Sequence, residues 1–336
     1  MDVVIGVIGC GYWGKNLVRN FIEAEECWLQ SICDTSEATL KKFGVRYPSL
    51  DRFTNYKDLI YSDKINTVVV ATPVRYHYFL AKEALLAGKN VLVEKPLAAS
   101  VKEAEELVEL ADKKGLVLMV DHTFLYTGSV RKIKELVDGG HIGNILYYDS
   151  VRVNLGLFQE DINVVWDLAP HDLSIMDYLL KEKPISVRAI GAAHVKKDIE
   201  NIGYLTLNFA SDLIAHFHFN WMSPVKIRLV LISGSEQMVV YDDLMPSEKV
   251  KVYATKVRVN NGEDESYKLH YDYRVGDMWA PKVDMSEALG RMCKDFALSI
   301  KEKRKPLSDA DSGLRIVRIL EAAQKSIKSN GEEVKL

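Results

Sequence analysis

The chain has little cysteine and no long hydrophobic run. Its four cysteines are scattered over 336 residues without a CxxC pair, which predicts reduced thiols in a cytoplasmic protein. They are Cys10, Cys27, Cys33 and Cys293. No apolar run approaches the roughly 20 residues that a membrane-spanning helix needs. The first residues also lack the basic region of a signal peptide, so we expect neither a membrane partner nor secretion.

An excess of basic residues is also missing. Lys and Arg number 44 against 47 Asp and Glu, for a net charge of −3. Proteins that hold nucleic acid by neutralising phosphates usually carry a basic excess, so we expect no nucleic-acid partner. The eight histidines show no HExxH-like spacing. His216 and His218 share one face of a predicted strand, but two side chains do not make a metal site, and we expect no metal.

What the chain does contain is enough apolar material for a folded core. Hydrophobic residues make up 48% and charged residues 27%, which are ordinary values for a soluble globular protein. At roughly 150 residues per domain, the length indicates about two domains.

The first third alternates short apolar runs with helical patterns. We expect strands at 3–8, 28–33, 66–71, 90–93 and 116–120, and helices at 14–25, 36–43, 77–87 and 101–114. Continuous apolar strands joined by helices predict a parallel sheet that is covered on both faces.

After about residue 122 the pattern changes. Strands follow one another without intervening helices, which predicts a mostly antiparallel sheet. We expect helices at 129–137, 168–180, 285–301 and 308–329, and strands at 145–153, 185–193, 203–209, 213–220, 225–233, 237–241, 249–254 and 267–273. The domains predicted are 1–122 and 123–336, with the last helix free to pack back on the first domain.

Residues 9–14 form a GxGxxG motif between the first strand and the first helix. Gly9 permits a tight turn, Gly11 lets the backbone approach a pyrophosphate, and Gly14 lets helix and strand pack closely. Asp34 follows Gly14 by 20 residues, at the end of the second strand. A carboxylate there accepts hydrogen bonds from an adenosine ribose and repels a 2′-phosphate, so the motif favours NAD over NADP.

Two further strand ends carry polar residues on the side where an open α/β sheet receives its ligand. Thr72 and Pro73 follow the third strand, with His77 one helical turn beyond, and we expect this loop to lie along the cofactor. Glu94 and Lys95 end the next strand. A lysine at that edge can donate a proton to a substrate oxygen.

Asp167 and His171 are spaced i, i+4 in the segment WDLAPHD, so they share one face of a predicted helix. In one interpretation they are structural, with Asp167 as the N-cap and Pro170 in the first turn. In the other, the imidazole accepts a hydroxyl proton as hydride leaves, and the carboxylate orients the imidazole or binds a second hydroxyl.

Taken together, these features resemble the glucose–fructose oxidoreductase, inositol dehydrogenase and rhizopine-catabolism (Gfo/Idh/MocA) family. The resemblance covers nearly the whole chain, through VIGCGYWGKN, ATPVRYHYFLAKEALLAGKNVLVEKPLA, WDLAPHDL and the closing DSGLRIVRILEAAQKSIKSNGEEVKL. It implies a Rossmann domain, then a domain with a large open sheet that mediates homodimers or homotetramers, and an active site between the domains. The chain departs from the family pattern at Val74, where the family commonly has Asn, and at Asp121, where related sequences often have a small residue.

The resemblance also implies roles for individual residues. Lys95 is the lysine of the EKP motif, and Asp167 and His171 match the DxxxH positions, with His171 as the acid/base. Lys95 as the base, with His171 orienting, remains an alternative. Contacts to the cofactor NAD are expected from Gly9, Gly11, Tyr12, Trp13, Gly14, Asp34, Thr72, Pro73, His77, Glu94 and Lys95.

At the level of the substrate, FLYTGSV, SVRVNLG and NWMSPVKIRLV are similar to the branch that acts on nucleotide sugars. That similarity implies oxidation at C3 of UDP-N-acetylglucosamine or its uronic acid. The candidate substrate contacts are Arg152, Asn154, Asn163, Trp221 and Lys226. The alternatives are an inositol or free-sugar dehydrogenase, a keto-sugar reductase, and a non-catalytic NAD-binding regulator.

Overall fold

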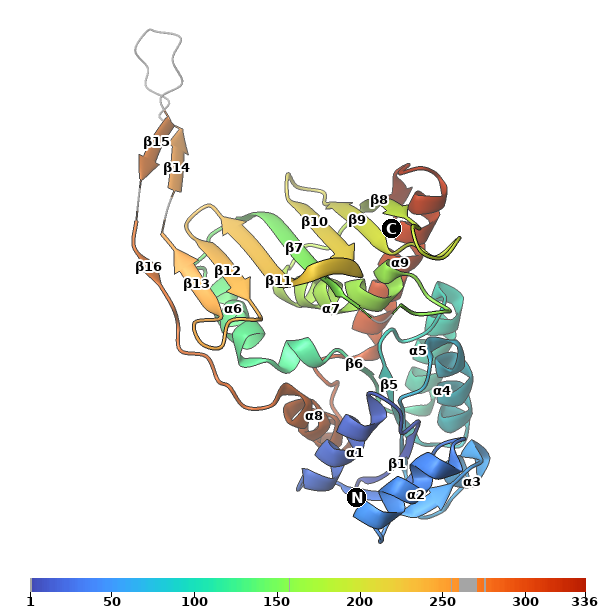
Figure 1. Ribbon diagram of the computed structural model, residues 1–336. Helices are drawn as coiled ribbons and strands as arrows, with labels where there is room; N and C mark the ends of the chain where they lie inside the picture. Colours follow the sequence, from blue (N-terminus) through green and yellow to red (C-terminus); the bar gives the residue numbers. More distant parts are fainter. Residues whose placement is uncertain (1, 157, 255, 260–270, 275) are drawn as a thin grey trace, which may run out of the picture. The chain divides into compact units, whose positions relative to one another are not determined.

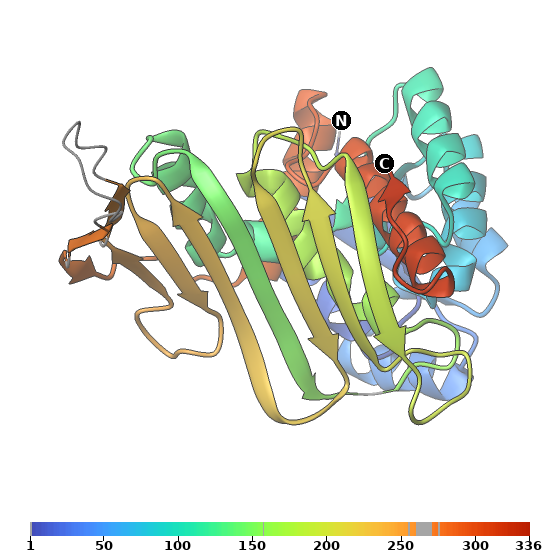
Figure 2. The same ribbon diagram turned by 90° about the horizontal axis from the view of Figure 1, so that it is seen from above.

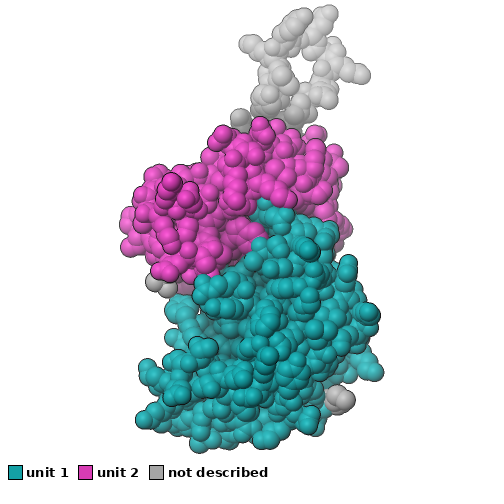
Figure 3. Space-filling view, turned by 90° about the vertical axis from the view of Figure 1, so that its right-hand side faces the viewer, with its two compact units in different colours: residues 1–126, 287–321 teal, residues 127–286, 322–336 magenta. Residues whose placement is uncertain are grey.

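The protein divides into two compact units, coloured separately in Figure 3. The first comprises Met1–Tyr126 and Glu287–Glu321, and the second comprises Thr127–Ser286 and Ala322–Leu336. The computed structural model describes all residues except 1, 157, 255, 260–270 and 275. Figure 1 shows the elements with their labels.

The first unit is built on a sheet of six parallel strands in the order β3-β2-β1-β4-β5-β6. The strands are β1 (Val4–Ile8), β2 (Trp28–Cys33), β3 (Asp51–Phe53), β4 (Thr67–Val70), β5 (Asn90–Glu94) and β6 (Leu118–Asp121). All four residues of β4 are buried, as expected for a strand covered on both faces. The sequence order reverses between β1 and β4, and such a reversal places a ligand crevice at the carboxyl ends of the strands.

The helical segments of this unit follow the strands closely. They are α1 (Gly14–Glu23), α2 (Glu37–Arg46), α3 (Tyr56–Ile60), η1 (Val74–Tyr76), α4 (His77–Leu86), α5 (Val101–Lys114), η2 (Thr123–Tyr126) and α8 (Ala288–Glu302). Helix α5 has the bounds that its sequence predicts. The Ser100 hydroxyl caps it by accepting the N–H of Glu103, and Gly115 ends it at a φ of 63°.

The second unit is built on a nine-stranded sheet in the order β16-β13-β12-β11-β7-β10-β9-β8-β17. Its strands are β7 (Ile145–Leu155), β8 (Ser186–Ala192), β9 (Ile202–Asn208), β10 (Ile214–Asn220), β11 (Met222–Gly234), β12 (Met238–Asp242), β13 (Val250–Tyr253), β16 (Met278–Trp279) and β17 (Val334–Lys335). Neighbours pair antiparallel except β10 with β7. The two sheets confirm the predicted fold class, a parallel Rossmann sheet and a mostly antiparallel second sheet.

Helices α6 (Gly128–Asp138) and α7 (Val164–Leu179) lie behind the nine-stranded sheet in Figure 2. Side chains alternate along β9 and β10: Leu205, Leu207 and Phe217 are buried, whereas Tyr204 and His216 are exposed. This alternation is typical of a sheet with one covered face. Helix α9 (Ala310–Lys328) and the hairpin β14 (Lys256–Val259) with β15 (Tyr271–Arg274) complete the described elements.

Helix α7 begins four residues earlier than predicted. Asn163 is its N-cap, because the amide oxygen accepts the N–H of Trp166 at 3.0 Å. The interpretation of Asp167 as the N-cap is therefore wrong. The sequence does not predict β3 or α3, because their three and five residues are too few to show the periodicity of a strand or a helix. Of the predicted strand 267–273, residues 267–270 lie outside the described residues.

Three structural findings bear on the expectations from composition. All four cysteines are free thiols. Within the described residues, no helix combines the length and the apolarity that crossing a bilayer demands. In the same part of the chain, no three His, Cys, Asp or Glu side chains are grouped so that they could hold a metal ion.

Candidate active site

The glycine-rich loop has three glycines with three different surroundings. Gly9 has a φ of +94°, and a Cβ there would lie 2.4 Å from the carbonyl oxygen of Ala71. A Cβ on Gly14 would lie 1.9 Å from the carbonyl oxygen of Gly9. At Gly11, in contrast, no atom of the described residues lies within 4 Å of the Cβ position. Gly9 and Gly14 are thus required by packing, whereas the backbone at Gly11 borders open space.

Asp34 lies beside this loop at the end of β2. One carboxylate oxygen accepts the N–H of Cys10 and the other accepts the N–H of Ser36, each at 2.8 Å. A carboxylate oxygen has the capacity to accept two hydrogen bonds, so each oxygen of Asp34 retains capacity for a hydroxyl donor. Burial, with the negative charge of Asp34, raises the pKa of the Cys10 and Cys33 thiols to about 12, so both remain neutral.

His77 connects the two loops that follow β4 and β5. Its side chain is buried, with Nδ1 2.8 Å from the carbonyl oxygen of Pro96 and Nε2 2.7 Å from that of Thr72. The Lys95–Pro96 peptide bond is cis. His77 therefore holds the loop of Thr72 against the loop of Lys95. The buried Thr72 hydroxyl has no hydrogen-bond partner within the described residues, which suits a contact to a bound coenzyme.

Asp121, the last residue of β6, belongs to the same edge of the sheet. It is 2% exposed, and its carboxylate accepts hydrogen bonds from the indole Nε1 of Trp13 at 2.8 Å and from the Thr123 hydroxyl. Burial raises the pKa of this carboxyl, although those two hydrogen bonds and the charge of Lys95 oppose the shift. In the sequence, the departure from the family pattern is the only signal at Asp121, and it does not indicate a role.

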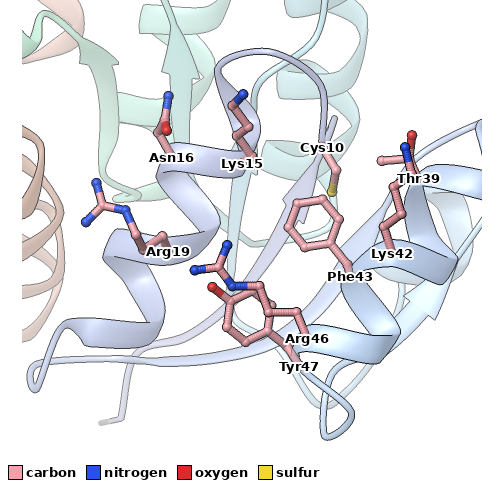
Figure 4. A pocket seen from close by; sticks show the side chains of 9 residues that line it. All are labelled: Cys10, Lys15, Asn16, Arg19, Thr39, Lys42, Phe43, Arg46 and Tyr47. Carbon is pink, nitrogen blue, oxygen red and sulfur yellow. The ribbon is translucent and has the colours of Figure 1, made fainter.

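A pocket of about 540 Å³ lies between α1 and α2, beside the glycine-rich loop (Figure 4). Lys15, Arg19, Lys42 and Arg46 line it, and no carboxylate is among its lining residues. The guanidinium of Arg19 is engaged by Glu287 at 2.6 Å. The remaining positive charge draws anions toward this side of the unit.

The Asp167/His171 pair lies near the start of α7 in the second unit. Both side chains are half-buried and one helical turn apart. The indole Nε1 of Trp221 donates to a carboxylate oxygen of Asp167 at 3.1 Å. Trp221 itself is 1% exposed and packs against Phe158, with ring centroids 5.6 Å apart. A buried tryptophan therefore fixes the carboxylate of the pair.

Three of the five candidate substrate contacts support the second unit internally. Arg152 is buried and forms a bidentate pair with Asp172, at 2.7 and 3.0 Å. Although burial opposes its charged form, the Asp172 carboxylate raises the pKa of Arg152. Asn163 caps α7 and also donates to Glu200 at 2.6 Å. Trp221 is the third, and a substrate contact from any of the three stays a prediction.

The other two candidates lie on adjacent strands of the sheet. Asn154 is half-buried on β7 and Lys226 is exposed on β11. The register of β11 against β7 shifts between Met222 and Ile227, so Lys226 lies within an irregular stretch. Such irregularities often re-aim side chains beside functional sites.

Comparison with known proteins places this geometry in a family. A model described as "Oxidoreductase family, NAD-binding Rossmann fold" matches residues 3–122, and one described as "GFO/IDH/MocA C-terminal domain" matches 130–240. The uncharacterised oxidoreductase YrbE of Bacillus subtilis is 24% identical, over 97% of this chain and 94% of its own.

Two solved structures share the fold over the full length. One is UDP-N-acetylglucosamine 3-dehydrogenase GnnA of Acidithiobacillus ferrooxidans, with a TM-score of 0.79, 21% identity, and coverage of 98% of this chain and 99% of that one. The other is GenD2 from gentamicin A biosynthesis in complex with NAD, with a TM-score of 0.82, 22% identity, and coverage of 100% and 96%. Because the family models match residues 3–122, which include the glycine-rich loop and the parallel sheet, and residues 130–240 of the second unit, the chain belongs to the Gfo/Idh/MocA family of NAD-binding oxidoreductases.

Proposed function

We propose that the protein is a dehydrogenase that oxidises a secondary hydroxyl of a sugar, at C3 of UDP-N-acetylglucosamine or its uronic acid. The observation that carries the proposal is the joint presence of Lys95 at the end of β5 and the Asp167/His171 pair on α7. The similarity of fold to UDP-N-acetylglucosamine 3-dehydrogenase supports the choice of sugar.

In this proposal each side chain has a defined task. His171 accepts the proton of the reacting hydroxyl, and Lys95 donates a hydrogen bond to the same oxygen. Bound NAD supplies the acceptor for the hydride that leaves the carbon, so the products are a ketone, NADH and a proton. Asp167 orients His171 and is itself oriented by the indole of Trp221. Exchange of the roles of Lys95 and His171 remains the alternative assignment.

The glycine-rich loop and Asp34 hold the coenzyme in this proposal. Gly11 admits the pyrophosphate, and the N-terminus of α1 favours its negative charge. Asp34 accepts the ribose hydroxyls and disfavours a 2′-phosphate, so NAD is preferred to NADP. Tyr12, Trp13, Thr72, Pro73, His77 and Glu94 complete the coenzyme surroundings.

For the substrate we give first place to Asn154 and Lys226. Neither side chain is buried in an ion pair, and an exposed ammonium is suited to the diphosphate of a nucleotide sugar. Arg152, Asn163 and Trp221 come second, because the structure already uses their side chains to hold α7 and the sheet.

The first experiment is single-turnover reduction of NAD. Protein stripped of coenzyme and reloaded with NAD is mixed separately with UDP-N-acetylglucosamine, its uronic acid, glucose and myo-inositol. We expect the absorbance of the reduced nicotinamide to rise with a UDP-sugar. A rise with free polyols alone would contradict the nucleotide-sugar assignment, and silence with NAD bound would favour a regulator without turnover.

Variants test the assigned residues. Lys95→Met and His171→Ala should each slow the single turnover by about 10²–10⁴-fold, the range expected for general acid–base catalysis. Lys41→Met and His141→Ala are matched controls, because both residues are exposed and lie outside the assigned site. If both site variants retained turnover within about tenfold of the wild type, the catalytic assignment would fail.

We also propose that the protein is a homo-oligomer in the cytoplasm. Ile190, Tyr204 and Ile214 are exposed on the nine-stranded sheet, and an exposed apolar face of that kind favours association with a second copy. The four free thiols suit a reducing compartment. Sedimentation velocity measures the assembly, and a monomer at all micromolar concentrations would contradict it.

A further inference from the structure

Asp121 and Trp13 lie at or after the ends of two strands of the parallel sheet that are not neighbours. Trp13 belongs to the loop after β1, and Asp121 ends β6, while β4 and β5 lie between them in the sheet. The 2.8 Å hydrogen bond from the indole Nε1 to the carboxylate therefore crosses the edge that carries Thr72 and Lys95. The contact is internal to the first unit, which contains all four residues.

The charges around Asp121 connect it to the same edge. Its strand register pairs it with Glu94 on β5, and the positive charge of Lys95 stabilises its ionised form. The charge of Asp121 also acts on the Cys293 thiol of α8, and His122 follows Asp121 in the chain. Burial raises the pKa of Asp121, so keeping an ionised carboxylate here costs folding free energy. Functional sites are where such a cost is commonly retained.

We infer that Asp121 is a positioning residue, which fixes the glycine-rich loop through Trp13 and supplies the negative charge that faces Lys95. The first part concerns NAD binding and is independent of the substrate, whereas the second rests on the proposed function of Lys95. The two parts can be tested separately by substitution. An amide at this position still offers an oxygen to the indole, but it carries no charge.

The first test is equilibrium binding of NAD to the full-length protein, followed by calorimetry. Asp121→Ala and Trp13→Phe should each weaken NAD binding about tenfold, because each removes the hydrogen bond that holds Trp13 of the glycine-rich loop. The double variant should be no weaker than either single one, since both remove the same bond. Asp121→Asn should bind NAD within about twofold of the wild type.

Trp28→Phe is the matched control for the indole, because Trp28 is exposed on β2 of the same unit. Equal losses in Trp13→Phe and Trp28→Phe would overturn the inference, as would additive losses in the double variant or an unchanged affinity in Asp121→Ala. NAD binding needs no sugar, so these outcomes stand even if every sugar fails to reduce NAD. If Asp121→Ala does not fold, Asp121→Asn and Trp13→Phe carry the test.

The second test is the pH profile of single turnover in Asp121→Asn. The substitution removes the carboxylate whose ionised form the charge of Lys95 stabilises, so the profile of the variant should differ from that of the wild type. The variant should also be at least as stable as the wild type at pH 8, because it no longer buries an ionisable carboxyl. An unshifted profile would overturn the electrostatic part, and a loss of stability at pH 8 would reduce Asp121 to a structural residue.

Discussion

The two units hold their polar side chains in different ways. In the first unit, His77 and Asp34 bond to backbone groups of the loops at the sheet edge. In the second, the polar residues of the candidate site bond mainly to other side chains, as Arg152 does to Asp172 and Trp221 to Asp167. A side chain that shapes a loop leaves a local sequence motif, whereas a partner on a distant strand leaves none. This explains why the glycine-rich loop and Asp34 form a local sequence motif, whereas the partners of Arg152 and Trp221 have no local signal in the sequence.

The largest effect on this comparison is expected at Arg152, in the second unit. If it supports the second unit, Arg152→Met leaves Asp172 buried without its partner and should lower the free energy of unfolding by about 3–5 kcal/mol. Urea unfolding measures this loss, and Arg152→Met/Asp172→Leu should recover most of it. Lys64→Met, which removes an ion pair between an exposed ammonium and Asp51, is the control and should cost no more than about 1 kcal/mol.

A stable Arg152→Met protein that no longer bound a UDP-sugar would reverse the interpretation and return Arg152 to the substrate site. A double variant as unstable as the single one would show that packing, and not charge pairing, governs this position.

The corresponding test in the first unit is His77→Ala. The variant removes the imidazole that lies between the carbonyls of Thr72 and Pro96, and loss of a buried hydrogen bond costs about 1–3 kcal/mol. We also expect weaker NAD binding, since the two loops are no longer held together. Thermal unfolding and calorimetry measure the two effects. His141→Ala, at an exposed position, should change neither, and unchanged NAD affinity in His77→Ala would restrict His77 to stability.

A smaller effect is expected on coenzyme selectivity, at Asp34 in the first unit. Asp34→Asn should weaken NAD binding about tenfold, equivalent to about 1.4 kcal/mol, and improve NADP relative to NAD, because the repulsion of a 2′-phosphate is removed. Glu37→Gln, which removes a neighbouring negative charge at the start of α2, is the control. Equal changes in the NAD-to-NADP affinity ratio for both variants would mean that general charge, and not the ribose contact, sets the preference.

The smallest effect is expected at the basic pocket between α1 and α2. Lys42→Glu should slow NAD association by about twofold to threefold at low salt, and the difference should vanish in about 1 M salt, where charges more than a few ångströms apart are screened. Stopped-flow fluorescence gives the rate. Lys41→Glu makes the same charge change outside the pocket lining, and an equal slowing there would exclude a local role for the pocket.

Much of the fold could be predicted from the sequence, for local reasons. Strand β2 and helix α5 have the bounds that their patterns predict, because a short, mainly apolar segment, a serine cap and a terminal glycine are all local signals. The start of α7 was misplaced because Asp167 and Pro170 resemble a helix start as much as Asn163 does. Only the hydrogen bond of Asn163 to Trp166 distinguishes them.

The sequence by itself determined the two sheet types, the glycine-rich loop and the family, since these depend on periodicity and on residues close together in the chain. The tertiary structure alone decided which polar residues pair across strands. It buried Arg152 against Asp172, joined Trp221 to Asp167, and brought Trp13 to Asp121 over 108 positions of sequence. The physical reason is that a buried polar group must find a partner, and the fold, not the local sequence, chooses which one.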